Sequence, residues 1–383
     1  MIYVNSVLAD KIESDSRRWN LVLRDQYGHT IDSQSGGVVS LMHTIDTTSG
    51  SIVPGDIITQ NVNITLKREA VASFYLKNDS IIYIEYRIVD TPGTIPMGKF
   101  KIHSVSTERH SVQVTAKDFF YGIDQKYQSQ LQYPTTIDKV VEEISTQLGL
   151  QGYEVYFPFE RLEVIEDETE PSQALYENLF DSANQQIYVK SQGSSYEISE
   201  PLQDCTLSEA LSYCAGVYGY MLTQSRDGKL TVCMTHSYLD YTLYRSRIDE
   251  PIMLYNDLQY EIVVINELRC KVNDSTIYSI TYEDLTGQPL SDDYKKIVVE
   301  FDNPLMTRSQ LLDIAWDYIY YFFDSATIEM RLADPRLDII DDIEYEVEPP
   351  EEYYAVYKRM PITSISYNFD GGLSCTLQGP KID

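Results

Sequence analysis

Histidine and cysteine side chains are the first candidates for chemistry in this 383-residue chain, because both bind metals and both act as bases or nucleophiles. No two histidines stand at the HxxxH spacing of a helical metal site, and no two cysteines form a CxxC pair. The pattern therefore favours surface or strand histidines and reduced, packed cysteines. The residues concerned are His29, His43, His103, His110, His236, Cys205, Cys214, Cys233, Cys270 and Cys375.

Phosphate-binding and hydrolase motifs are also absent from the sequence. Gly98-Lys99 and Gly228-Lys229 are not followed by the Ser or Thr that completes a P-loop, and there is no GxGxxG and no GxSxG. Asp338, Asp341 and Asp342 lack the glycine and the terminal glutamate of a calcium loop, which favours a solvated turn over a cation site. We therefore expect no catalytic residues, no enzyme activity, no cofactor and no metal.

The chain is strongly acidic, with 59 Asp and Glu against 30 Lys and Arg and a formal net charge of −29. A protein that grips nucleic acid through its phosphates needs clustered basic residues, so we expect no specific nucleic-acid binding. The same charge suits a surface past which DNA slides without sticking, although it also serves solubility.

The sequence gives no sign of membrane insertion or secretion. No apolar run approaches the length of a membrane span, which favours a soluble protein. Met1-Ile2-Tyr3-Val4 begins like a strand and lacks the basic start and apolar run of a signal peptide. We therefore expect synthesis and assembly in the cytoplasm.

A β-module occurs twice in the chain, near residues 75–118 and 332–377. Three segments that alternate apolar and polar residues follow one another in the same order, with spacings that differ by one residue. Two unrelated meanders of β-forming residues are the alternative. The matched segments are Ile84-Glu85-Tyr86 with Ile343-Glu344-Tyr345, residues 102–106 with 362–366, and residues 112–115 with 373–376.

The remaining elements divide the chain into four parts. Residues 1–125 carry many short branched or aromatic runs separated by turn residues, which predicts a β-barrel or sandwich. Apolar spacing predicts a helix over 136–148, followed by an insertion up to residue 200 that contains an acidic stretch at 159–170. Residues 201–254 form a helix and a hairpin, and residues 255–383 are again rich in strands.

Two helix starts carry capping boxes. Thr206 with Glu209 opens a helix whose buried stripe contains Leu207, Ala210, Leu211 and Cys214. Asp227-Gly228 then predicts a type I′ hairpin. Thr307 with Gln310 opens a helix over about 308–323, and its expected core face is Leu311, Leu312, Ala315, Ile319 and Phe322.

Several stretches, in this order, resemble the hub proteins of phage tail baseplates. The chain departs from the family pattern at Asp341, where the family has glycine before the aspartate, and the acidic 159–170 stretch matches nothing in it. The similar stretches are residues 96–102, 114–118 and 121–124 (the end of a tube domain), residues 206–211 and 227–230 (a helix and a d-G-k-L hairpin), Ile265-Asn266-Glu267-Leu268, residues 334–343 and Gly371-Gly372-Leu373.

The resemblance implies a homotrimeric structural hub in the baseplate of a virion or phage-tail-like particle, such as a contractile tail or a bacteriocin. Its implied partners are the tail tube protein, the central spike protein and other baseplate components. The duplication gives this a physical purpose, because a trimer of a two-module chain presents six near-equivalent modules to a sixfold tube and keeps a threefold axis for the spike. An acidic channel would then let cargo pass.

The predicted fold is mainly β with α+β insertions: two similar tail-tube-like domains, at 1–125 and 255–383, the second with one inserted helix, plus smaller α/β parts at 126–200 and 201–254. Strand pairing between subunits would remove exposed sheet edges. The expected interface strands are Ile81–Tyr86 and Ile343–Val347, although pairing within a domain is an alternative. The interface residues are Ile81, Tyr83, Glu85, Ile343, Tyr345 and Val347.

Two other functions stay open at this point. The chain could be the hub-like part of a siphophage tail-tip protein. It could also be a cell-wall-acting or carbohydrate-binding β-protein, because carboxylates and aromatic residues are abundant and a glycosidase pair is defined by distance rather than by sequence.

Overall fold

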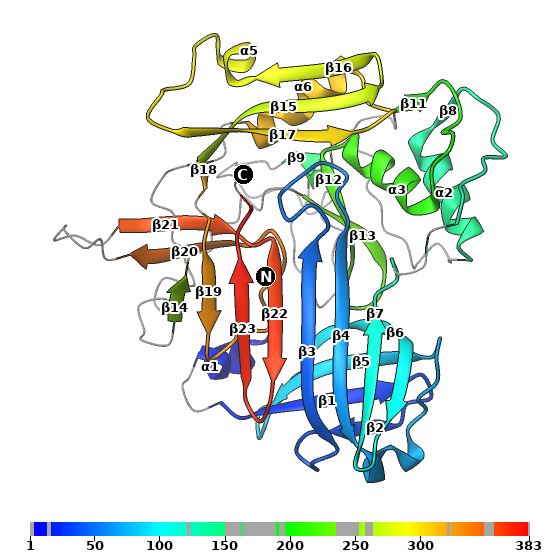
Figure 1. The fold of residues 1–383 in the computed structure, drawn as a ribbon, viewed down its shortest axis with the longest axis vertical. Helices are drawn as coiled ribbons and strands as arrows, with labels where there is room; N and C mark the ends of the chain where they lie inside the picture. Colours follow the sequence, from blue (N-terminus) through cyan, green and yellow to red (C-terminus); the bar gives the residue numbers. More distant parts are fainter. Residues whose placement is uncertain are drawn as a thin grey trace.

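The computed structural model describes residues 4–13, 17–120, 123, 125–149, 162–163, 189–190, 196–234, 253–256, 263–319, 322–323, 325–347 and 356–381. The described chain is mainly β with small helical insertions, as the sequence predicts (Figure 1). No described helix has the length and the apolar character needed to span a membrane. The acidic 159–170 stretch lies outside the described residues, except for the short strand β9 (Leu162–Glu163), which pairs with β10 (Val189–Lys190).

One sheet of eleven strands organises the molecule, and it contains strands from both ends of the chain. It runs in the order β14-β19-β23-β22-β3-β4-β7-β6-β5-β1-β2, and its central strands stand side by side in Figure 1. The strands are β14 (Met253–Asn256), β19 (Thr327–Met330), β23 (Leu373–Gln378), β22 (Ser364–Phe369), β3 (Val38–Thr47), β4 (Ile58–Lys67), β7 (Ser111–Lys117), β6 (Ile95–Thr107), β5 (Ile81–Ile88), β1 (Trp19–Asp25) and β2 (Thr30–Asp32).

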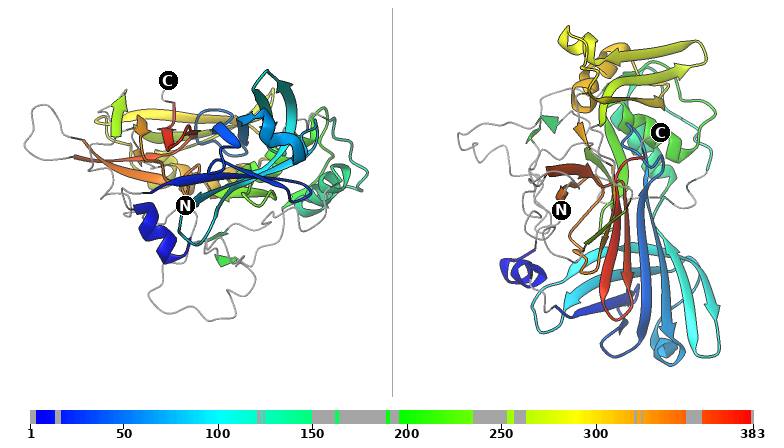
Figure 2. Two further views of the ribbon diagram at one scale, coloured as in Figure 1. Left: turned by 90° about the horizontal axis from the view of Figure 1, so that it is seen from below. Right: turned by 60° about the vertical axis from the view of Figure 1, so that its left-hand side comes forward.

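Alternation of apolar and polar residues makes these segments strands and fixes which face they bury. In β4 every second residue from Ile58 to Leu66 is buried, and the residues between Gln60 and Leu66 that alternate with them are half-buried. The sheet curls at its β1, β2, β5 end (Figure 2), where α1 (Ser6–Glu13) contacts β5 and the 3₁₀ turn η1 (Arg68–Ser73) contacts β4. One apolar core extends from this end to β22 and β23.

The two β-regions are therefore joined in a single sheet, where the sequence predicted two domains. The second region also contains more than the one inserted helix expected. Between β14 and β19 lies an α/β unit with its own sheet, in which β15 pairs with β16, β17 and β18 and the helix α6 packs on β15 and β16. Its elements are β15 (Val263–Asn273), β16 (Thr276–Thr281), α5 (Tyr282–Thr286), β17 (Lys295–Asp302), α6 (Arg308–Tyr318) and β18 (Phe322–Phe323).

A second apolar core lies between α2 (Ile137–Gln147), α3 (Leu207–Gly216) and β12 (Tyr220–Gln224). The helix predicted at 136–148 is confirmed, as is the helix at 207, which begins with the expected capping box at Thr206. The apolar stripe predicted for α3, which contains Leu207, Ala210, Leu211 and Cys214, is buried. β12 pairs with β13 (Leu230–Met234), and β8 (Thr135–Thr136) with β11 (Glu197–Ile198).

The hairpin between β12 and β13 exists, but its turn is not type I′. Ser225 and Lys229 pair across a three-residue loop, and the amide of Gly228 donates to the carbonyl of Ser225. Only Gly228 in this loop has a positive φ, of 87°, whereas type I′ needs two such residues.

The predicted face of α6 is partly wrong. The capping box at Thr307 is present, but the helix ends at Tyr318, and Phe322 lies in β18. Leu312 and Trp316 are exposed, at 38% and 57% of their surface, while Ile314 and Tyr318 are buried. An apolar pattern alone did not distinguish these two sides of the helix.

Candidate functional site

Two four-stranded units within the large sheet have the same order of strands. The first unit is β3-β4-β7-β6 and the second unit is β14-β19-β23-β22. In the second unit β21 (Val356–Pro361) and β22 together take the place of β6, because β21 pairs with β20 (Asp342–Val347) as the start of β6 pairs with β5. Each unit therefore has the same chain path, and the second is a structural copy of the first.

The two units agree residue by residue in their hydrogen-bond registers. Asn63 of β4 lies opposite Met42 and Thr115, and Glu329 of β19 lies opposite Leu254 and Thr376. The neighbouring pairs follow in step on β4 and β19. The burial pattern repeats too, since Val62 and Ile64 are buried in the first unit, and Ile328 and Met330 in the second.

The repeat seen in the sequence is thus a real structural repeat, with one error of alignment. Val114 and Cys375 hold equivalent positions, as predicted. Ile102 lies opposite Ala116, whose equivalent Leu377 lies opposite Ile365, so Ile102 corresponds to Ile365 rather than to Ile362. A bulge in β6 after Ile102, and the gap between β21 and β22, displaced the match.

The two units join head to tail. β22, the last strand of the second unit, pairs antiparallel with β3, the first strand of the first unit, over six residue pairs from Ser364–Asp46 to Phe369–Leu41. The contact uses different strands on each side, so it is heterologous, which is the type of contact that generates rings or filaments when it is repeated.

The outward face of the joined units carries almost no charge. Directly opposite residues of neighbouring strands share a face, which places Asn368, Met42, Asn63 and Thr115 in one row across four strands. The charged residues on this face are Lys101 in β6, Glu329 in β19, and residues at the ends of strands. The uncharged residues are Met42, Thr44, Asn61, Asn63, Thr65, Gln113, Thr115, Ser366, Asn368, Ser374 and Thr376.

The excess of acid is not evenly spread along the chain. Residues 17–120, which hold the first unit, contain 11 Lys and Arg against 10 Asp and Glu, although the whole chain has a net charge of −29. Thr115 donates to Asn63 at 3.0 Å and Thr65 to Gln113 at 2.9 Å, so hydroxyl and amide groups pair on the outward face.

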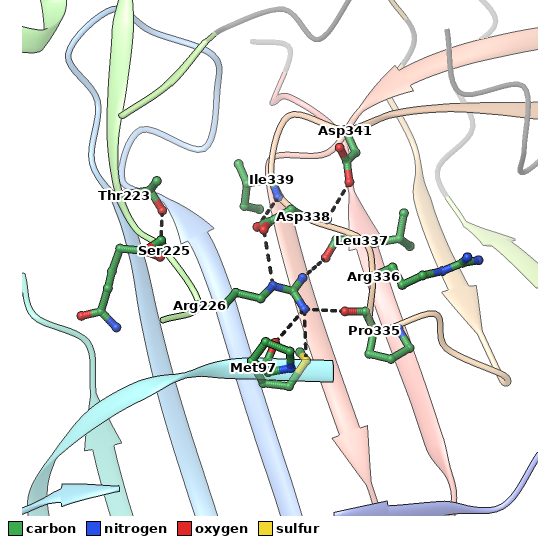
Figure 3. A network of polar contacts seen from close by, with 12 residues as sticks. Met97, Thr223, Ser225, Arg226, Pro335, Arg336, Leu337, Asp338, Ile339 and Asp341 are labelled. Atoms are coloured by element: carbon green, nitrogen blue, oxygen red, sulfur yellow. Dashed lines mark hydrogen bonds and ion pairs between the residues drawn. The ribbon is translucent and has the colours of Figure 1, made fainter. Parts of the chain in front are cut away.

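Arg226, at the tip of the β12–β13 hairpin, connects the two β-regions (Figure 3). Its guanidinium donates to the carbonyl oxygens of Pro335 (2.6 Å), Leu337 (2.7 Å) and Pro96 (3.2 Å), and it lies 3.5 Å from a carboxylate oxygen of Asp338. Arg226 is only 7% exposed. One buried cation therefore satisfies backbone groups of β6 and of the turn that precedes β20.

A chain of buried amides continues this connection into β3 and β4. The side chain of Gln224 donates to the carbonyl of Lys99 at 2.7 Å, and the side chain of Gln60 donates to the carbonyl of Gln224 at 3.0 Å. Gln60 also lies 3.1 Å from Nε2 of His43. Burial lowers the pKa of His43 to about 4, so the imidazole is neutral at pH 7.

The turn predicted at Asp338, Asp341 and Asp342 is solvated only at Asp338, which is half-exposed, so the prediction is wrong for the other two. Asp334, Asp341 and Asp342 are buried, and Asp334 accepts hydrogen bonds from Arg336. Burial raises the pKa of the Asp341 carboxyl, which accepts from the amide of Asp338 at 2.8 Å. The family's glycine position is Asp341, but the residue with a positive φ, of 73°, is Ile340.

The predicted interface strands differ in their surroundings. β5 pairs with both β1 and β6, so Ile81, Tyr83 and Glu85 take part in pairing within the chain, which was the stated alternative. β20, which contains Ile343, Tyr345 and Val347, pairs only with β21 among the described strands. Ile343 itself is buried. A role for these residues in an interface stays a prediction.

Sequence reasoning missed the residues that join the β-regions. Neither Arg226 nor Gln224 stands out in the sequence, because nothing in its spacing indicates a hydrogen-bond acceptor far along the chain. All five cysteines are free, and four of them are buried. Within the described ranges no three His, Cys, Asp or Glu residues come together in a way that would hold a metal ion.

Comparison with known proteins gives likeness at the level of structure. No family model and no curated protein sequence matches the chain. A tail protein from Neisseria meningitidis MC58 has a TM-score of 0.51 at 12% identity, with 95% of this chain and 97% of that chain covered. The chain therefore shares the fold of this tail protein.

Two further solved structures are similar over nearly the whole chain. A 43 kDa tail protein of prophage MuSo2 from Shewanella oneidensis has 12% identity, a TM-score of 0.47 and coverage of 94% of this chain and 98% of that chain. An Escherichia coli protein described as a component of the type VI secretion system has 9% identity, a TM-score of 0.42 and coverage of 94% and 77%.

Proposed function

From a fold shared with a tail protein, we propose that this chain is a structural baseplate hub that forms a homotrimeric, pseudo-sixfold ring. The ring adapts a sixfold tail tube to a threefold central spike in a virion or phage-tail-like particle. Its partners are further copies of the chain, the tube protein, the spike protein and other baseplate components.

The head-to-tail pairing of β22 with β3 is the observation that carries this proposal. Two similar units in one chain are already joined by a heterologous contact, so three chains supply six units for a closed ring. The buried connection through Arg226 fixes the angle between the two units within a chain, because its hydrogen bonds require a defined geometry.

The wall of the channel is the outward face of the joined units in this proposal. That face bears hydroxyl and amide groups instead of the acidic residues expected from the net charge. Such a surface has neither the basic clusters that hold phosphates nor the aromatic core of a protein interface, so a polyanion or a protein passes without binding.

The role is structural, and no catalytic step is assigned to any residue. A structural role is supported by the tail-protein fold and by the use of the buried polar side chains described above in hydrogen bonds to backbone groups.

Mass photometry and particle imaging test the proposal. We expect a trimer of the 44.1 kDa chain, alone or with its tube and spike partners, and a ring located between tube and spike. A protein that remains a monomer in all these mixtures, or a subunit placed on the outside of the particle, would contradict it. Clearing of peptidoglycan that is lost on one Asp or Glu substitution would instead support an enzyme.

A further inference from the structure

The internal junction between the two units predicts where the next subunit binds. In the second unit β22 pairs with β23 on one edge and with β3 on the other. In the first unit the equivalent segment of β6 is residues 104–107, because Ser104, Val105 and Ser106 lie opposite Thr115, Val114 and Gln113 of β7. No described strand covers the other edge of this segment.

This edge is open because β5 is too short to cover it. β5 begins at Ile81, which lies opposite Lys101, so that residues 104–107 extend beyond it. Ser104, Ser106 and Thr107 are exposed and Val105 is half-buried. An uncovered strand edge presents unpaired backbone N–H and C=O groups, which makes it a template for another strand.

The matching edge lies at the opposite end of the sheet. β14 is the equivalent of β3, since Leu254 lies opposite Glu329 as Met42 lies opposite Asn63. β3 receives β22 from within the chain, whereas the far edge of β14 has no partner among the described strands. Each chain therefore has two unpaired strand edges, one on residues 104–107 of β6 and one on β14. They are equivalent to the edges of β22 and β3 that pair within the chain, so they are complementary.

Resting on the proposed hub function, we propose that residues 104–107 of β6 pair antiparallel with β14 of a neighbouring copy of this chain. The register of β22 on β3 transfers directly. Asn368 lies opposite Met42 within the chain, and the equivalent residues are Ser106 and Leu254. Ser106 of one copy thus lies opposite Leu254 of the next, and Ser104 opposite Asn256.

The charges of the two edges allow this contact in an acidic protein. Residues 104–107 and 253–256 contain no charged side chain, although the chain has a net charge of −29. Two copies can therefore pair these segments without like-charge repulsion between the paired side chains. Three such contacts close the ring, and neither the edge of β14 nor that of residues 104–107 is then left unpaired in any copy.

Disulfide cross-linking tests this register in assembled trimers. In antiparallel strands the Cα atoms of opposite residues are about 4.5–5.5 Å apart, within disulfide range. The double variant Ser106→Cys with Leu254→Cys should give covalent dimers and trimers under mild oxidation. A shift of two residues moves the sulfurs out of range, so Ser106→Cys with Asn256→Cys should cross-link at least tenfold less.

The internal junction provides a matched positive control. Met42→Cys with Asn368→Cys should form a disulfide within one chain and no covalent oligomer, because these residues face each other in the same molecule. Each single Cys variant gives the background. Trimers that form normally but show no covalent species above that background overturn the pairing and leave the hub function intact. A chain that never forms trimers overturns both.

Discussion

The guanidinium of Arg226 lies 2.7 Å from the carbonyl oxygen of Leu337, 111 residues further along the chain. This contact joins a hairpin that belongs to the α2–α3 part to the turn that opens the second unit's hairpin. Because the same guanidinium also binds Pro335 and Pro96, the three segments cannot separate without leaving buried carbonyl groups unpaired.

Arg226→Met should lower the free energy of unfolding by about 3–5 kcal/mol, because it removes a buried cation and leaves its carbonyl partners unsatisfied. Chemical denaturation followed by tryptophan fluorescence measures the loss. Lys229→Met on the same hairpin is the control: its ion pair with Asp227 is exposed to water, so the change should stay within about 0.5 kcal/mol. Equal losses in the two variants would contradict the role given to Arg226.

Protonation of His43 should destabilise the junction at acid pH. Burial holds the pKa of His43 at about 4, below the unfolded value of about 6.5, with Arg226 and Asp338 as the charged groups acting on it. The unfolded chain therefore binds more protons between these values, and stability present above pH 6.5 declines as the pH falls toward 4. Melting temperatures across this range should fall less steeply for His43→Gln than for the wild type. Parallel curves would exclude His43 as the cause.

Gly228→Ala should cost more stability than Gly287→Ala, although both glycines have a positive φ. A Cβ at Gly228 would lie 2.5 Å from Cδ and 2.8 Å from Cβ of Lys99, whereas Gly287 has no atom within 4 Å. The Gly287 variant therefore reports backbone strain alone, about 1 kcal/mol, and the difference between the two reports the close approach of the hairpin to β6. Thermal unfolding of both variants checks this, and equal losses would show that the hairpin does not lie against Lys99.

Thr206→Ala should destabilise the protein by about 1 kcal/mol, because the threonine hydroxyl accepts from the amide of Glu209 at the start of α3. Thr206→Ser keeps the acceptor and should lose only a few tenths of that. Calorimetry can resolve the two. A serine variant as unstable as the alanine variant would show that packing of the methyl group, rather than capping, is responsible.

The sequence predicted those elements whose signal is local. The helix at α2, the capping boxes at Thr206 and Thr307 and the repeated strands each depend on residues within a few positions of one another. The shared sheet was not predicted because the pairing of Ser366 with Thr44 leaves no local trace. The burial of Asp334, Asp341 and Asp342 was not predicted either, because polar residues in sequence indicate a solvated turn and do not show which segments cover them.

The place of the α/β unit between β14 and β19 has a consequence for the symmetry of the proposed ring. In the first unit the equivalent strands β3 and β4 are joined by residues 48–57 alone, while in the second they are separated by residues 257–326. Around a closed ring, every other position then bears a bulky lobe and its neighbours bear a short loop. The lobes give one rim of the ring threefold symmetry, so a threefold partner can bind that rim in only three equivalent orientations. The strands of the sheet still repeat six times around the same axis.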